Sequence, residues 1–177
     1  MKRHLAGWSI AAVLAVTQGA PAQAIEQGTP QTTHPAGHGG AHQEHDMLIR
    51  GSKAMGFDQL TTTHRFLLRP EGGAIEITAN DPADAAAIQS IRRHLEHIQG
   101  AFAAGDFSLP VFIHAAEPPG AAVLRERRAH LQYAFEEIEK GGRLTIRTSD
   151  AAARGALHAF LRFQITEHKT GDPRDPK

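Results

Sequence analysis

Residues 64–82 read HRFLLRPEGGAIEITANDP, and residues 133–151 follow the same pattern as YAFEEIEKGGRLTIRTSDA. When the two segments are aligned at their Gly-Gly pairs, Ile75 matches Leu144 and the neighbouring apolar residues also coincide. Alternating apolar residues on either side of a glycine turn are typical of a β-hairpin. The sequence therefore contains two copies of a hairpin, and a helical stretch follows each copy.

The helical stretches are expected to cover the hairpins. Asp81 is the predicted N-cap of the first helix, and apolar residues then recur at three- and four-residue steps from Ile88 to Phe102. Ser149 or Asp150 is the predicted N-cap of the last helix. Because strands with one apolar face need a cover, we predict an α+β fold. It consists of two pseudo-symmetric ββα units around an antiparallel sheet with helices on one face.

The connection between the two units contains further elements. Leu109–His114 is a short apolar run and is predicted as a strand. Residues 121–129 are rich in Arg, Leu and Glu and are predicted as a short helix. Residues 133–140 could continue that helix by composition, but the repeat favours the hairpin.

The N-terminus has the features of a secretory signal peptide. Lys2 and Arg3 give a basic start, residues 5–16 are apolar but too short to span a bilayer, and a small-x-small cleavage motif ends at Ala24. We expect residues 1–24 to be removed by cleavage near Ala24. The alternative is an uncleaved membrane anchor, which the short apolar run disfavours. The mature protein would then be periplasmic or secreted and would not span the membrane.

Three regions follow the predicted cleavage site. Residues 25–49 form a tail of mainly Gly, Pro and polar residues, and we predict that it is disordered because it could not bury a core. Residues 50–172 form a single α+β domain, and residues 173–177 form a frayed C-terminus. Several neutral imidazoles on a flexible chain can converge on one metal ion. The candidate residues for metal capture by the tail are His34, His38, His42 and His45.

Composition excludes several kinds of site. The chain has no cysteine, so thiolate metal sites, Fe–S clusters, haem c attachment and cysteine nucleophiles are excluded. Acidic and basic residues number 19 each, and loss of Lys2 and Arg3 leaves a small acidic excess, which gives no electrostatic footprint for nucleic acid. Both Gly-Gly pairs lie in hairpin turns instead of between a strand and a helix, so we expect no nucleotide site. The G-x-S-x-G motif of a nucleophile elbow is not found.

Histidine is the unusual residue, with 12 in the chain. His64 shares a predicted strand face with Phe66 and so points toward the helix-covered side of the sheet. His94 and His97 are one helical turn apart, which lets two imidazoles reach one ion. His168 projects onto the apolar face of the last helix. Three histidines with an open fourth position suit Zn²⁺ or Cu²⁺. The candidate metal ligands are His64, His94, His97 and His168, with His114 as a further candidate.

Each of these histidines also has a structural interpretation. His64 and His114 could bond a neighbouring backbone group, and His168 could stabilise the C-terminus of its helix, where the helix dipole favours a cation. His130 and His158 are predicted to lie at the surface. The spacing does not choose between a shared site and separate structural roles, because no closed motif such as H-E-x-x-H is present.

Three stretches resemble a family of small exported bacterial proteins. They are residues 55–66 with Met-Gly-Phe-Asp and Thr-Thr-Thr-His-Arg-Phe, residues 94–98 with His-Leu-Glu-His-Ile, and residues 160–172 with Phe-Leu-Arg-Phe-Gln-Ile-Thr-Glu-His-Lys-Thr-Gly-Asp. The resemblance covers about residues 50–173, and the last stretch is the most specific. Members are sometimes labelled aspartate carbamoyltransferase, but the Ser-Thr-Arg-Thr-Arg motif is absent here and the chain is too short for two domains. The resemblance implies no particular activity, although its stretches contain His64, His94, His97 and His168.

The leading hypothesis is an exported metal-binding protein that handles copper or zinc through its histidines. The first alternative is a periplasmic binding or assembly module without metal, whose partner would be a peptide or another periplasmic protein. The second alternative is a small periplasmic enzyme with a histidine base or a bound metal, which a pocket holding histidine and a perturbed carboxylate would favour. We name no catalytic residue and lean against an enzyme.

Overall fold

The structure is a computed structural model that describes residues 39–177, so the predicted cleavage point near Ala24 and the tail residues His34 and His38 lie outside the described residues. The described elements belong to one compact unit. Short 3-10 turns precede the first and third strands. The helices and strands are, in chain order, α1 (Gly39–Met55), β1 (Thr62–Arg69), β2 (Gly72–Ala79), α2 (Ala85–Ala103), α3 (Ser108–His114), α4 (Ala121–Glu126), β3 (Gln132–Ile138), β4 (Gly141–Arg147) and α5 (Ala151–Glu167).

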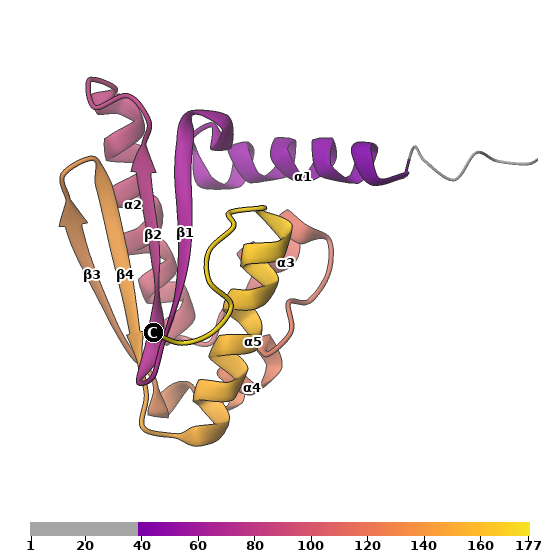
Figure 1. Cartoon of the computed structure of the whole chain (residues 1–177), viewed down its shortest axis with the longest axis vertical. Coiled ribbons are helices and arrows are strands. Elements are labelled where there is room, and N and C mark those ends of the chain that lie inside the picture. The colour runs from indigo at the N-terminus through magenta and orange to yellow at the C-terminus, as the bar shows by residue number, and fades with distance from the viewer. Residues whose placement is uncertain (1–38) are drawn as a thin grey trace, which may run out of the picture. The chain divides into compact units, whose positions relative to one another are not determined.

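The four strands form one antiparallel sheet in the order β1-β2-β4-β3 (Figure 1). β1 pairs with β2 and β3 pairs with β4, which confirms both predicted hairpins. Ile75 pairs with Leu144, the residue that it matches in the sequence repeat. A pseudo-twofold axis therefore passes between β2 and β4 at this pair, and the predicted α+β class is confirmed.

Each long helix packs on the hairpin of the other unit. α2 follows β2 in the chain but contacts mainly β4 and β3, whereas α5 follows β4 and contacts β1 and β2. Figure 1 shows α5 beside β1 and α2 behind β2 and β4. A Cβ atom on Gly73 would collide with Leu161 of α5, and one on Gly142 would collide with Leu95 of α2. Glycine at both positions therefore lets the exchanged helices approach the sheet closely.

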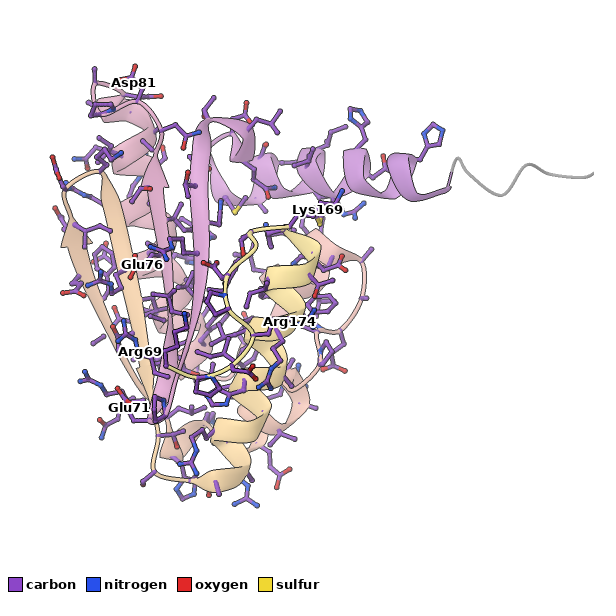
Figure 2. The ribbon with its side chains drawn as sticks, in the orientation of Figure 1. Arg69, Glu71, Glu76, Asp81, Lys169 and Arg174 are labelled. Atoms are coloured by element: carbon purple, nitrogen blue, oxygen red, sulfur yellow. The ribbon has the colours of Figure 1, made fainter. Side chains whose placement is uncertain are left out.

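The other face of the sheet is charged. Arg143 of β4 donates hydrogen bonds to Glu76 of β2 at 2.7 Å and to Glu136 of β3 at 2.8 Å. Glu76 is labelled on its strand in Figure 2. Ile75 and Ile77, on either side of Glu76, are buried in the core. The helices thus cover one face of the sheet, and cross-strand ion pairs occupy the opposite face.

The prediction of a strand at Leu109–His114 is wrong, because these residues lie in α3. The Ser108 N–H donates to the Asp106 carboxylate at 2.8 Å where the helix starts. Pro110 fits the first turn, where a helix needs no N–H donor. A short apolar run does not by itself distinguish a strand from a buried helix.

The N-cap of α2 is Asp84 instead of the predicted Asp81. The carboxylate of Asp84 accepts from Ala87 N–H at 2.9 Å, and Asp150 caps α5 in the same way from Ala153 N–H at 2.7 Å. Asp81 lies in the loop before α2 (Figure 2). The alignment of the hairpins matches Asp150 with Asp81, but the cap equivalent to Asp150 is Asp84. Relative to its hairpin, α2 therefore begins about one turn later than α5 does.

The helix α1 overlaps the tail that the sequence predicts as disordered. It begins at Gly39, so residues 39–49 are helical in the structure. Met47 and Met55 are buried and belong to the hydrophobic core. Burial of two long apolar side chains stabilises this helix, although its first residues are mainly small and polar.

The C-terminal residues 173–177, predicted to be frayed, are held against the edge of β1. Asp172 accepts from Phe66 N–H at 2.9 Å, and Lys177 N–H donates to the Leu68 carbonyl at 3.3 Å. These bonds satisfy backbone groups of an edge strand that would otherwise be unpaired. Figure 2 shows Arg174 of this segment in front of α5.

Candidate functional site: a histidine-lined cavity

A small cavity lies between the sheet and the helices. Its volume is about 50 Å³, which is room for a few water molecules or for one ion with a water ligand. Most of its lining is apolar, and the exceptions are the Met55 thioether, the Gln164 amide and four imidazoles. The imidazoles come from β1, α2, α3 and the end of α5, and they belong to His64, His94, His114 and His168.

His168 lies between two other imidazoles. Its ring centroid is 5.3 Å from that of His64 and 5.2 Å from that of His114. The His64 ring is nearly parallel to it, at 18°, and the His114 ring is nearly perpendicular, at 85°. His168 is the C-cap residue of α5, so the end of this helix brings its ring against β1 and α3. The structure thus brings together three residues that are far apart in the sequence.

Two ring nitrogens in this cluster are buried without a hydrogen-bond partner. They are Nε2 of His64 and Nδ1 of His114. The other nitrogen of His114, Nε2, lies 3.0 Å from the amide oxygen of Gln164. Because that oxygen can only accept, Nε2 carries the proton and Nδ1 keeps a free lone pair, and the Glu167 carboxylate lies 3.8 Å from Nδ1, beyond hydrogen-bond distance. Buried polar atoms are nearly always paired, so these two nitrogens are candidates for holding a ligand.

His94 approaches the cavity from the other side. Its ring makes an edge contact with Phe57, with centroids 5.6 Å apart, and Phe57 also lies 6.0 Å from the His64 ring. Phe57 is buried, as is Met55 two residues earlier. The Phe57 ring of the segment after α1 therefore contacts both imidazoles, which line the same cavity.

Burial keeps the cavity imidazoles neutral. It lowers the pKa of His64 to about 4. Burial, with a smaller effect of the neighbouring histidines, lowers the pKa of His94 and of His168 to about 3. Burial also lowers the pKa of His114, although the bond to Gln164 opposes it. At neutral pH these rings therefore carry free lone pairs and no charge.

The pseudo-twofold axis relates the histidine cluster to an aromatic cluster. The Phe102 ring lies 6.4 Å from Tyr133 and 5.9 Å from Phe160. The strands of the two units are aligned at their Gly-Gly pairs, and the helices at their N-caps, Asp84 and Asp150. In this alignment each of the three aromatic residues matches a histidine. A carbon ring fills the same architectural position in the other unit, so packing alone does not require imidazole nitrogens. The matched pairs are His64 with Tyr133, His94 with Phe160 and His168 with Phe102.

The remaining predicted ligands lie elsewhere. His97, a candidate ligand of the shared site, is exposed on α2 and does not line the cavity. His42 and His45 of the predicted tail are exposed on α1. These three imidazoles are accessible to solvent and lie outside the buried cluster.

His158 does not fit its predicted surface position. It is half-buried on α5, and its Nε2 lies 3.0 Å from the Arg69 carbonyl and 2.9 Å from the Gly72 carbonyl. An N–H group at Nε2 thus holds the β1–β2 turn against the helix. His130 is exposed, as predicted.

Sequence reasoning missed two residues of the cavity, Met55 and Gln164. Gln164 is four residues before His168 and is only 4% exposed, so a polar residue on the apolar face of the last helix was the available signal. Met55 ends α1, and its position against the cavity depends on a helix that the composition of the tail does not indicate.

The ring positions allow two imidazoles to bind one metal ion, but they do not supply a full set of ligands. Bonds of about 2.0–2.1 Å in tetrahedral geometry place two ring centroids about 5 Å apart, close to the two separations at His168. Within residues 39–177, however, no group of three or more His, Cys, Asp or Glu side chains is arranged to hold a metal ion. A third ligand would therefore require side-chain rotation into the cavity.

Gln164→Leu is expected to lower the free energy of unfolding by about 1–3 kcal/mol, because the buried N–H of His114 would lose its acceptor. Urea unfolding followed by circular dichroism measures this change. Nitrogen-15 NMR should show the Nε2-protonated form of His114 in the wild type. A wild-type protein protonated at Nδ1 would contradict the assignment of the free lone pair.

The chain matches no protein-family model, and comparisons with curated proteins and with solved structures give no match. In the part of the chain that the structure describes, no helix combines the length and apolar character needed to cross a membrane. The resemblance to small exported bacterial proteins stays a prediction from the sequence.

Proposed function

We propose that this protein is an exported metal-binding protein that holds copper or zinc in the cavity between His64, His114 and His168. The observation that carries the proposal is the pair of buried ring nitrogens without hydrogen-bond partners, which belong to His64 and His114 on either side of His168. His94 lines the same cavity and supplies a fourth imidazole.

The donor set supports copper or zinc over other ions. The cavity lining contains imidazoles, one amide and one thioether, and no carboxylate. Imidazole ligands suit zinc and copper, whereas magnesium, calcium and manganese prefer oxygen ligands. The lowered histidine pKa values also support metal binding, because protons compete weakly for the ligand nitrogens at neutral pH.

The sequence assigns a role to the exposed histidines as well. His42 and His45 lie on α1, which follows the histidine-containing stretch and ends at Met55 beside the cavity. Together with His34 and His38, they would capture the ion outside the folded site. Export by the predicted signal peptide would place this capture in the periplasm or outside the cell.

Metal titration of the mature protein tests the proposal. Binding of Cu(I) and Zn²⁺ is measured by competition with a chromophoric chelator, together with elemental analysis after periplasmic expression. We expect one tightly bound ion per chain. In the aromatic triple variant His64→Tyr/His94→Phe/His168→Phe, which introduces the residues of the pseudo-symmetric cluster, affinity should fall by about a hundredfold or more.

Two controls make the result specific. His130→Ala removes an exposed imidazole and should leave the affinity unchanged. Replacing His34, His38, His42 and His45 by alanine should reduce weak binding but keep the tightly bound ion. Failure of every variant and of the wild type to retain metal would refute the proposal and favour a binding module without metal.

A further inference from the structure

A surface pocket adjoins the histidine-lined cavity at the end of α1. Its volume is about 240 Å³. It shares two lining residues with the inner cavity, Met55 and His94, and His97 lines its outer side. The two spaces therefore meet at one thioether and one imidazole.

The three donors of this pocket come from two elements. His94 and His97 are one turn apart on α2, which is the spacing that lets two imidazoles reach one ion. Met55 is the last residue of α1, and Gly56 follows it with φ +78°, a left-handed conformation that ends the helix. Exposure decreases from His97, which is exposed, through His94, which is half-buried, to the buried Met55.

Arg93 is a charged residue of the pocket lining, and Asp106 is a charged residue that interacts with His97 from outside it. Arg93 lines it, but its guanidinium donates a hydrogen bond to Ser90 Oγ at 3.0 Å. The Asp106 carboxylate interacts electrostatically with His97, and hydrogen bonds from Ser108 lower its pKa, so it is ionised at neutral pH. A negative charge near His97 favours a cation at the outer side of the pocket.

A second surface pocket is less suited to copper. It has a volume of about 350 Å³ and shares His64 and His168 with the inner cavity. Its other lining groups include the Met47 thioether and the oxygens of Thr62, Thr63 and Glu167. Hard oxygen ligands suit other ions, whereas thioether and imidazole ligands together select Cu(I). Each of these two surface pockets has two imidazoles and one thioether, but the lining of the α1–α2 pocket contains no carboxylate.

We propose that Met55, His94 and His97 form an outer Cu(I) site through which the ion passes to the inner cavity. The inference rests on the proposed function and narrows the ion to monovalent copper. Cu(I) first binds the exposed His97 together with His94. It then moves inward as Met55 and His94, which face both spaces, pass it to the inner imidazoles. No bond other than the metal–ligand bonds changes, and copper keeps its oxidation state.

Stopped-flow loading tests the outer site. The mature protein is mixed with Cu(I) held by a chromophoric chelator under anaerobic, reducing conditions, and the loss of chelator colour gives both rate and affinity. His97→Ala should slow loading by about tenfold or more, because a surface ligand raises the local ion concentration at the cavity. Its equilibrium affinity should stay within about twofold of the wild type. Met55→Leu should slow loading and weaken Cu(I) binding, but should leave Zn²⁺ binding nearly unchanged.

Matched controls separate the two proposals. His130→Ala also removes an exposed imidazole and should load at the wild-type rate. Equal loading rates for His97→Ala and the wild type would overturn the outer site, and so would a loss of affinity without a change in rate. In either case a wild-type protein that still binds copper keeps the proposed function. A wild type that binds Zn²⁺ but takes up no copper overturns the Cu(I) site and keeps the proposed function, whereas a wild type that binds neither ion overturns both proposals.

Discussion

Gly141→Ala should unfold the domain or lower its free energy of unfolding by more than about 3 kcal/mol. The two hairpins meet only where β2 pairs with β4, and Gly141 is the first residue of β4 in this pairing. A Cβ atom there would overlap the carbonyl oxygen of Ile77 in β2. Because the obstacle is a backbone atom in the ladder, no side-chain rotation can relieve the overlap.

The pseudo-twofold axis predicts the same effect at the equivalent position. A Cβ atom on Gly72 would overlap the Ile146 carbonyl oxygen of β4. Gly72 also has φ +150°, a conformation that other residues rarely adopt. Gly72→Ala should therefore destabilise the protein at least as much as Gly141→Ala, which urea unfolding followed by circular dichroism can measure.

Two other glycines are matched controls for these substitutions. Gly100 and Gly155 are exposed within α2 and α5, and a Cβ atom on either would have no neighbour within 4 Å. Alanine at these positions should raise the free energy of unfolding by about 0.5–1 kcal/mol. A Gly141→Ala protein that unfolds within about 1 kcal/mol of the wild type would show that the strands separate readily at this point.

The repeat made the architecture predictable, because local patterns determine hairpins and caps. Alternation around the two glycine turns predicted all four strands, and Ile75 and Leu144, which match in the sequence alignment, are paired between β2 and β4. The exchange of helices between the two hairpins was not predictable from these patterns. This exchange depends on which part of the sheet each helix packs against. The close approaches of the helices at Gly73 and Gly142 join residues that are far apart in the sequence, so no local pattern indicates them.

The candidate site was predictable in part. His64 and His168 were predicted from their positions on apolar faces, because strand and helix periodicity determine which side of an element is buried. His114 was included as the end of a strand but lines the cavity from the helix α3. Gln164 has the weak signal of a polar residue on an apolar helix face, whereas Met55 has no periodic signal for a site, since its role depends on tertiary neighbours alone.

Acidification of the metal-free protein should destabilise it between pH 6.5 and about 4. Burial lowers the pKa of His64 from 6.5 to about 4, so below pH 6.5 the unfolded chain binds a proton that the folded protein excludes. The stability from this group is therefore fully present above pH 6.5 and is lost as the pH falls toward about 4. His94 and His168, with pKa values of about 3, act in the same direction and extend the effect to lower pH.

The magnitude is large compared with the stability of a domain. The pKa shift of His64 alone corresponds to a loss of roughly 3 kcal/mol in the free energy of unfolding, while that of an ordinary domain is about 5–15 kcal/mol. We therefore expect acid unfolding to be under way above pH 4, before His64 is protonated in the folded state. Urea unfolding at pH 7.5, 6 and 5 in the presence of a chelator measures the loss at each step.

The aromatic triple variant separates the histidines from the carboxylates that also titrate in acid. It retains every Asp and Glu of the protein, including the Glu76 and Glu136 that pair with Arg143, and replaces only three of the four cavity imidazoles. Of the cavity imidazoles only His114 remains in this variant, so its stability should fall less than that of the wild type between pH 7.5 and 5 and the two curves should diverge. If the free energy of unfolding fell equally with pH in the wild type and the variant, the histidine rings would have to reach solvent when they are protonated. Divergent curves, together with loss of metal binding in the same variant, would mean that the buried nitrogens reduce stability in acid and are retained for their ligand.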